Sequence, residues 1–198
     1  MLDERRRFRL ANHLNKNGEN SMNDALANAY LESVLFRFRN AKELGDKAMD
    51  QLDDSDFTWR PGPESNSIAV IVQHLHGNMI SRWTDFLISD GEKPTRNRDA
   101  EFEEPLWTSR DELLDAWNAG WDCLLNAISA IRPEDLLNEV QIRGQALTAL
   151  DAINRQLSHV AYHVGQIVYL ARMCKGDAWQ TLSIARGASR DYTPRKRD

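Results

Sequence analysis

Two histidines four residues apart, His159 and His163, are the residues of this sequence best suited to chemistry. They lie in a strongly helical stretch, and residues four apart on a helix have Cβ atoms roughly 5–6 Å apart on one face. Two imidazoles placed in this way can bind one metal ion together. Three protein ligands leave one coordination position open, which is the usual arrangement of a reactive metal. With a third histidine from an earlier helix, the spacing predicts a metal site inside a helical bundle.

The choice of the third histidine stays open on spacing alone. His74 and His76 both border the apolar stripe of an earlier predicted helix. They point about 200° apart, because a helix has about 3.6 residues per turn. His13 lies in a polar N-terminal segment and is a poor candidate.

The helix of His159 and His163 carries a second stripe beside its aliphatic one, made of Ala149, Ala152, Gln156, His159, His163, Gln166 and Leu170. Alanines leave space beside the histidines, and the two glutamines add polar groups. A polar, partly hollow seam suits a ligand site. Asn78, one turn beyond His74, could orient that histidine or a ligand, with an ordinary capping or surface role as the alternative. We expect Tyr162 to pack in the core, with a hydrogen bond to a substrate as the alternative.

The residues between the paired histidines limit the chemistry of the site. Zinc peptidases place a glutamate there as general base, whereas this chain has Val160, Ala161 and Tyr162. A hydrolase of that kind is disfavoured. A metal without a neighbouring carboxylate base would lower the pKa of a water or a thiol at its open position. Cys123 and Cys174 lie well inside or late in predicted helices, where we expect buried fillers and no nucleophile.

Four segments have the helical spacing of apolar residues, and no segment of comparable length alternates with period two. The sequence therefore predicts an all-α four-helix bundle with long inter-helix connections. The predicted helices begin at about residue 23, at Asn66 or Ser67, at Ser109 and at Ala146, and they end at about residue 53, at Asp90, before Pro133 and at Lys175. The stretch 138–143 alternates too briefly for more than a short strand or an extended connector.

The remaining segments are expected to be tails and loops. We expect residues 1–21 to be a disordered tail, residues 22–178 to form the bundle, and residues 179–198 to be a partly disordered extension. The longest connection, about residues 91–107, is rich in charge, and we expect a solvated loop whose charges pair with one another. The alternative is a lid over a site at one end of the bundle.

Composition excludes several functional classes. The chain has 198 residues, a formal net charge of −5, and no apolar run long enough for a signal peptide or a membrane span. An acidic chain without a basic stripe is not attracted to nucleic acid or anionic membranes, so small molecules are the expected partners. Two cysteines without CxxC spacing fit a reducing cytoplasm.

The order of these motifs resembles the DinB/YfiT-like metal-binding proteins. The resemblance rests on Val72-Gln-His-Leu75 and on Leu157-Ser-His-Val-Ala-Tyr-His-Val-Gly-Gln166, and it covers about residues 23–176. It implies that His74 joins His159 and His163 as the third ligand, and that His76 is a neighbour. It also implies a four-helix bundle with a long crossover, often dimeric, which holds one divalent metal such as zinc or nickel.

Characterised enzymes of that superfamily use the metal to activate a low-molecular-weight thiol. By this resemblance we expect a cytoplasmic, homodimeric, metal-dependent enzyme of the thiol S-transferase type, acting on a small-molecule thiol. The alternative is a non-catalytic metal-binding or small-molecule-binding protein, or a stress-response interaction module, because fold membership does not determine chemistry.

Overall fold

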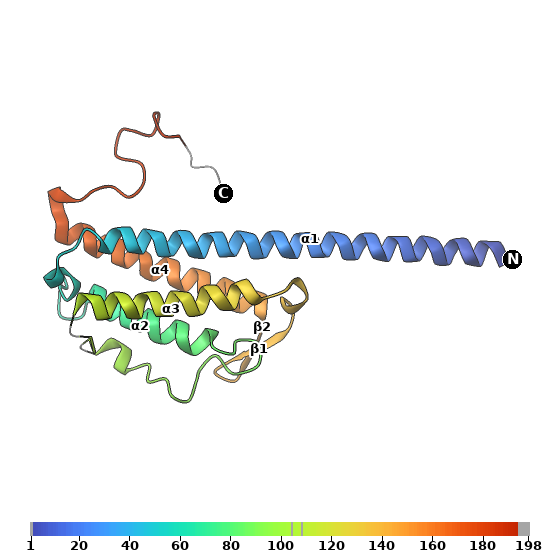
Figure 1. Ribbon diagram of the computed structural model, residues 1–198, viewed down its shortest axis with the longest axis horizontal. Coiled ribbons are helices and arrows are strands. Elements are labelled where there is room, and N and C mark those ends of the chain that lie inside the picture. The colour runs from blue at the N-terminus through green and yellow to red at the C-terminus, as the bar shows by residue number, and fades with distance from the viewer. Residues whose placement is uncertain (1, 104, 108, 194–198) are drawn as a thin grey trace.

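Four long helices dominate the chain in the computed structural model, which describes residues 2–103, 105–107 and 109–193, with side chains from residue 22. They are α1 (Leu2–Met49), α2 (Ile68–Trp83), α3 (Arg110–Ala130) and α4 (Ala149–Lys175). The short 3-10 turns are η1 (Asp54–Phe57), η2 (Ala100–Phe102), η3 (Pro133–Asp135) and η4 (Gly176–Ala178). Helix α1 packs mainly against α4, and α2 against α3 (Figure 1). The predicted mostly helical bundle is confirmed.

The chain order makes the connection between α2 and α3 a long crossover. Helices α2 and α3 run in the same direction, opposite to α1 and α4, so the connection returns along the bundle before α3 begins (Figure 1). Between α3 and α4 lies a hairpin of β1 (Glu139–Ile142) and β2 (Gln145–Thr148), paired antiparallel. The all-α expectation is therefore corrected by one small two-stranded sheet in the stretch expected to be a short strand or connector.

Helix α1 begins at Leu2, about twenty residues before the predicted start. Its N-terminal part projects beyond the bundle, away from the other helices (Figure 1). The predicted division of the chain into a tail, a bundle and an extension stays a prediction.

Two other helix boundaries differ from the prediction for local reasons. Helix α2 ends at Trp83 and not at Asp90, because the chain turns out of the helix at Thr84 and Asp85 has φ 52°. Phe86 fits the apolar spacing of the predicted helix although it lies beyond the end of α2. The chain folds back there, and the Phe86 ring packs on Trp83 with 4.4 Å between the ring centroids. Helix α4 begins at Ala149, after Thr148, whose hydroxyl accepts from the amide of Asp151.

The predicted caps at the other two helices are present. Ser67 accepts a hydrogen bond from the amide of Val70 at the start of α2. Ser109 accepts from the amide of Glu112 at the start of α3. Each side chain satisfies a helix amide that has no partner within its own helix.

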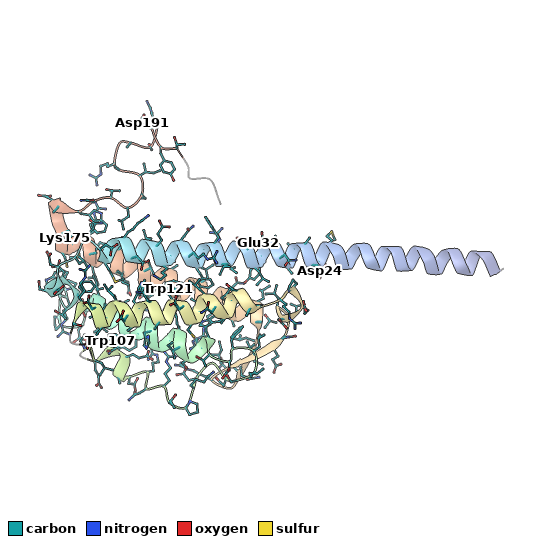
Figure 2. All side chains as sticks on the ribbon, in the orientation of Figure 1. Asp24, Glu32, Trp107, Trp121, Lys175 and Asp191 are labelled. Carbon is teal, nitrogen blue, oxygen red and sulfur yellow. The ribbon has the colours of Figure 1, made fainter. Side chains whose placement is uncertain are left out.

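The core lies where the four helices meet, and side chains fill the space between them (Figure 2). Trp117 and Trp121 of α3 are fully buried, and their rings pack edge to face at 5.4 Å. Gly45 brings α1 close to α3, since a Cβ there would lie 2.7 Å from Trp117. The indole nitrogen of Trp117 donates to Asp46 Oδ1 at 2.6 Å. The close approach at Gly45 and this hydrogen bond fix α1 against α3.

Within the described residues, no helix has both the length and the apolar character needed to cross a membrane. Cys123 and Cys174 are free thiols and only half-buried, so they are not the fully buried fillers that the sequence suggested.

Candidate metal centre

Three histidines from two helices come together inside the bundle. His74 lies on α2, and His159 and His163 lie one turn apart on α4. One ring nitrogen from each lies within 4.8 Å of the others, and His74 Nε2 is 3.1 Å from His159 Nε2. His76 is directed elsewhere, because its Nδ1 donates to the carbonyl of Ala116 at 2.8 Å. The fold thus distinguishes His74 from His76 as the third histidine of the cluster, which spacing alone could not do.

A buried carboxylate from the crossover orients His74. Glu101, in η2, accepts a hydrogen bond from His74 Nδ1 at 2.8 Å. Arg96 donates to the same carboxylate through Nε at 2.7 Å and Nη2 at 2.8 Å, a bidentate pair. Burial alone would raise the pKa of Glu101, but the hydrogen bonds from Arg96 and His74 outweigh it and hold the pKa below its ordinary value. Glu101 is therefore ionised at neutral pH, and His74 presents Nε2 to the other histidines.

His163 is held in a similar way by its own helix. Its Nδ1 donates to Gln166 Oε1 at 2.8 Å, which fixes the ring and leaves Nε2 for another partner. His159 differs, because its Nδ1 is buried without a hydrogen-bond partner in the described part of the chain. The paired nitrogens of His74 and His163 reproduce the outer contacts that metal-binding histidines usually make.

The surroundings keep the two α4 imidazoles neutral. Burial, with added repulsion from His163, His74, Arg82 and Arg96, lowers the pKa of His159 to about 3. Burial and His74 lower the pKa of His163 to about 4. A metal binds the neutral imidazole, so both rings are in the required form at neutral pH. Three close imidazole nitrogens are a donor set that suits zinc, nickel, copper or iron. The residues present therefore fit a divalent metal ion.

A cavity of about 380 Å³ adjoins the three histidines. Gln156 and Asn78 line it and are buried, and Tyr162 lines it at the surface, 64 % exposed. The structure thus brings all four predicted pocket residues, including Gln166, beside the histidines. The prediction that Tyr162 packs in the core is wrong, since its exposed ring lies against His163 with 4.9 Å between the ring centroids. Asn78 forms no hydrogen bond with His74, whose partner is Glu101.

Sequence reasoning missed two groups of residues at this site. Glu101 and Arg96 come from the charge-rich crossover, which we expected to be solvated and self-paired. Its charges do pair, but Glu101 is buried against His74. Arg82 and Arg155 also line the cavity. The spacing of these two arginines could have indicated that they lie on the same helix faces as the histidines. Arg82 follows His74 by two helical turns, and Arg155 precedes His159 by one.

A comparison of the sequence with protein families finds a match. A family model described as a protein of unknown function, DUF1572, matches residues 25–188. The chain belongs to the DUF1572 family. The match includes the three histidines, Glu101 and the arginines of the cavity, so the whole candidate site lies within the DUF1572 region. A comparison with curated proteins finds none that matches this sequence.

Proposed function

We propose that this DUF1572 protein is a DinB-like metalloenzyme that binds one divalent metal ion, zinc or nickel, through His74, His159 and His163. The observation that carries the proposal is the convergence of three imidazole nitrogens within 4.8 Å beside a cavity, with His74 oriented by a buried carboxylate. A surface histidine pair has no need of such a buried partner. The expected homodimer is part of the proposal, and light scattering of the purified protein tests it.

The reaction that we propose is activation of a low-molecular-weight thiol for transfer to a small acceptor. When bound, a divalent ion supplies Lewis-acid chemistry, lowering the pKa of a thiol or water at an open coordination position. Glu101 and Gln166 hold two of the imidazoles in place, and the cavity admits a small molecule. Among the described residues, the cavity lining contains no carboxylate that could serve as a general base. This composition favours a thiol, which needs no base once ionised, over hydrolysis.

Metal content of the untagged protein, measured by mass spectrometry without added metal, tests the site. We expect near one equivalent of metal in the wild type and strong loss of metal in His163→Ala. His76→Ala is the matched control, since that imidazole bonds to the Ala116 carbonyl and not to the cluster. A wild type that is free of metal and resists loading with Zn²⁺ or Ni²⁺ contradicts the proposal.

A screen of small thiols with electrophilic acceptors then tests the chemistry. We expect turnover by the loaded wild type and none by a folded His163→Ala variant. A protein that binds metal stoichiometrically but consumes no thiol supports the alternative of a non-catalytic metal-binding protein.

A further inference from the structure

Arg82 lines the cavity as a buried cation, and one of its hydrogen-bond donors is unused. It lies on α2, two helical turns after His74, and is 8 % exposed. Its Nη2 is 3.6 Å from Glu92, and its Nη1 is buried without a hydrogen-bond partner in the described part of the chain. An unsatisfied donor on a buried charge is costly. A negatively charged ligand in the cavity would remove that cost.

The cavity as a whole has an excess of positive charge. Five arginines contribute to its lining, namely Arg82, Arg96, Arg98, Arg143 and Arg155. Among the residues that the structure describes, two carboxylates pair with them, Glu101 with Arg96, and Glu92 with Arg96, Arg143 and Arg82. In a chain of net charge −5, such a concentration of guanidinium groups is a local feature that attracts anions.

Arg155 is the arginine best placed to share an anion with Arg82. It lies on α4 one turn before His159, and no ion pair joins it to a described residue. Its charge is near enough to lower the pKa of Arg82, which burial and this repulsion bring to about 10. Arg82 is still charged at neutral pH. Glu92 offsets part of this charge, but the two cations still repel each other, and an anion bound between them would remove that repulsion.

The β hairpin adds Arg143 to the same cavity. Arg143 and Gly144 form its two-residue loop with φ values of 56° and 69°, a turn in which asparagine usually precedes glycine. Asp90 accepts hydrogen bonds from the amides of both residues and so fixes the loop beside α2. A non-glycine residue at positive φ is strained, and here the strained residue carries a guanidinium to the cavity rim.

We propose that the cavity binds its substrate through a small anionic group, a carboxylate or a phosphate, held between Arg82 and Arg155. The role of this anion as part of a reacting thiol or acceptor rests on the proposed function, whereas the binding of the anion does not. Arginine suits the task because its planar fork matches both oxyanions.

Binding of two similar thiols by calorimetry tests the proposal. The probes are 3-mercaptopropionate, which carries a carboxylate, and 2-mercaptoethanol, which carries a hydroxyl in its place. We expect the metal-free full chain to bind 3-mercaptopropionate roughly tenfold or more tightly, the contribution of a charge-assisted hydrogen bond. The same preference is expected in the Zn²⁺-loaded protein. The measurement on the metal-free chain does not depend on metal binding or on catalysis. A preference for 3-mercaptopropionate there supports anion binding even if the protein proves not to be a metalloenzyme.

Three variants locate the anion. Arg155→Gln and Arg82→Gln should each reduce the preference for 3-mercaptopropionate by roughly tenfold. Arg172→Gln, an exposed arginine elsewhere on α4, should leave it unchanged. Arg155 is exposed, so its variant is informative even if Arg82→Gln does not fold. Inorganic phosphate should compete with 3-mercaptopropionate, and the ratio of the two affinities tells which oxyanion the cavity prefers. Equal binding of both thiols, or a preference that survives Arg155→Gln, overturns the proposal.

Discussion

Replacing Glu101 by glutamine changes the metal site without touching a ligand. The carboxylate accepts one hydrogen bond from His74 and two from Arg96. An amide of the same shape has only one acceptor oxygen and replaces the other with a donor. If the oxygen stays toward Arg96 Nε, the amide nitrogen faces His74 Nδ1 and favours the tautomer with its proton on Nε2. That nitrogen is the one that His74 presents to the cluster.

The size of the effect follows from these contacts. Loss of an outer partner of a metal-binding histidine typically weakens metal binding about 10- to 100-fold, or about 1.4–2.7 kcal/mol. The Arg96 side chain is 3 % exposed and keeps Glu92 as a partner at 3.0 Å. The metal-free protein should therefore lose about 1–3 kcal/mol of unfolding free energy, the cost of one unsatisfied buried donor, and should still fold.

Competition with a chelating indicator measures the dissociation constant for Zn²⁺, and urea denaturation measures the stability of the metal-free protein. Glu103→Gln is the matched control, because Glu103 is an exposed carboxylate of the same connection. We expect it to change neither quantity. A folded Glu101→Gln protein that binds Zn²⁺ within twofold of the wild type would refute the view that this carboxylate orients His74.

Two further substitutions test packing, one beside the site and one between α1 and α3. Gly77→Ala should weaken metal binding about tenfold, since the added Cβ would collide with Glu101 Oε1 and displace the carboxylate from His74. The control, Gly165→Ala on α4, meets nothing within 4 Å and should raise stability by about 0.5–1 kcal/mol without changing metal affinity, as seen by the same two assays. Trp117→Phe should lower the unfolding free energy by about 1.5–3 kcal/mol in urea, because it removes a hydrogen bond to the Asp46 carboxylate. Unchanged stability would mean that this bond contributes nothing to the contact of α1 with α3.

The sequence predicted those parts of the protein that depend on local periodicity. The caps at Ser67 and Ser109 and the placement of His159 and His163 on one helical face follow from spacing within a single element. The choice between His74 and His76 does not, because it depends on how α2 is rotated against α4. Only the resemblance to a family indicated His74.

The residues that support the site were the least predictable. Glu101 is 27 residues from His74 in a connection without periodicity, so no sequence spacing relates the two. The crossover looked solvated because its charges outnumber its apolar residues, yet those charges neutralise one another in the interior. The end of α2 was misplaced for a related reason, since Phe86 is buried by a turn of the chain and not by a helix.

The position of Glu101 on a connection rather than on a helix makes metal affinity and loop conformation thermodynamically linked. The three candidate ligands lie on helices α2 and α4, but the group that sets the His74 tautomer lies on the connection between α2 and α3. A ligand or partner that stabilised another conformation of this connection would weaken metal binding. By reciprocity, metal binding would oppose that conformation by the same free energy. The crossover would then be the part of this protein through which metal occupancy can be sensed from outside the bundle.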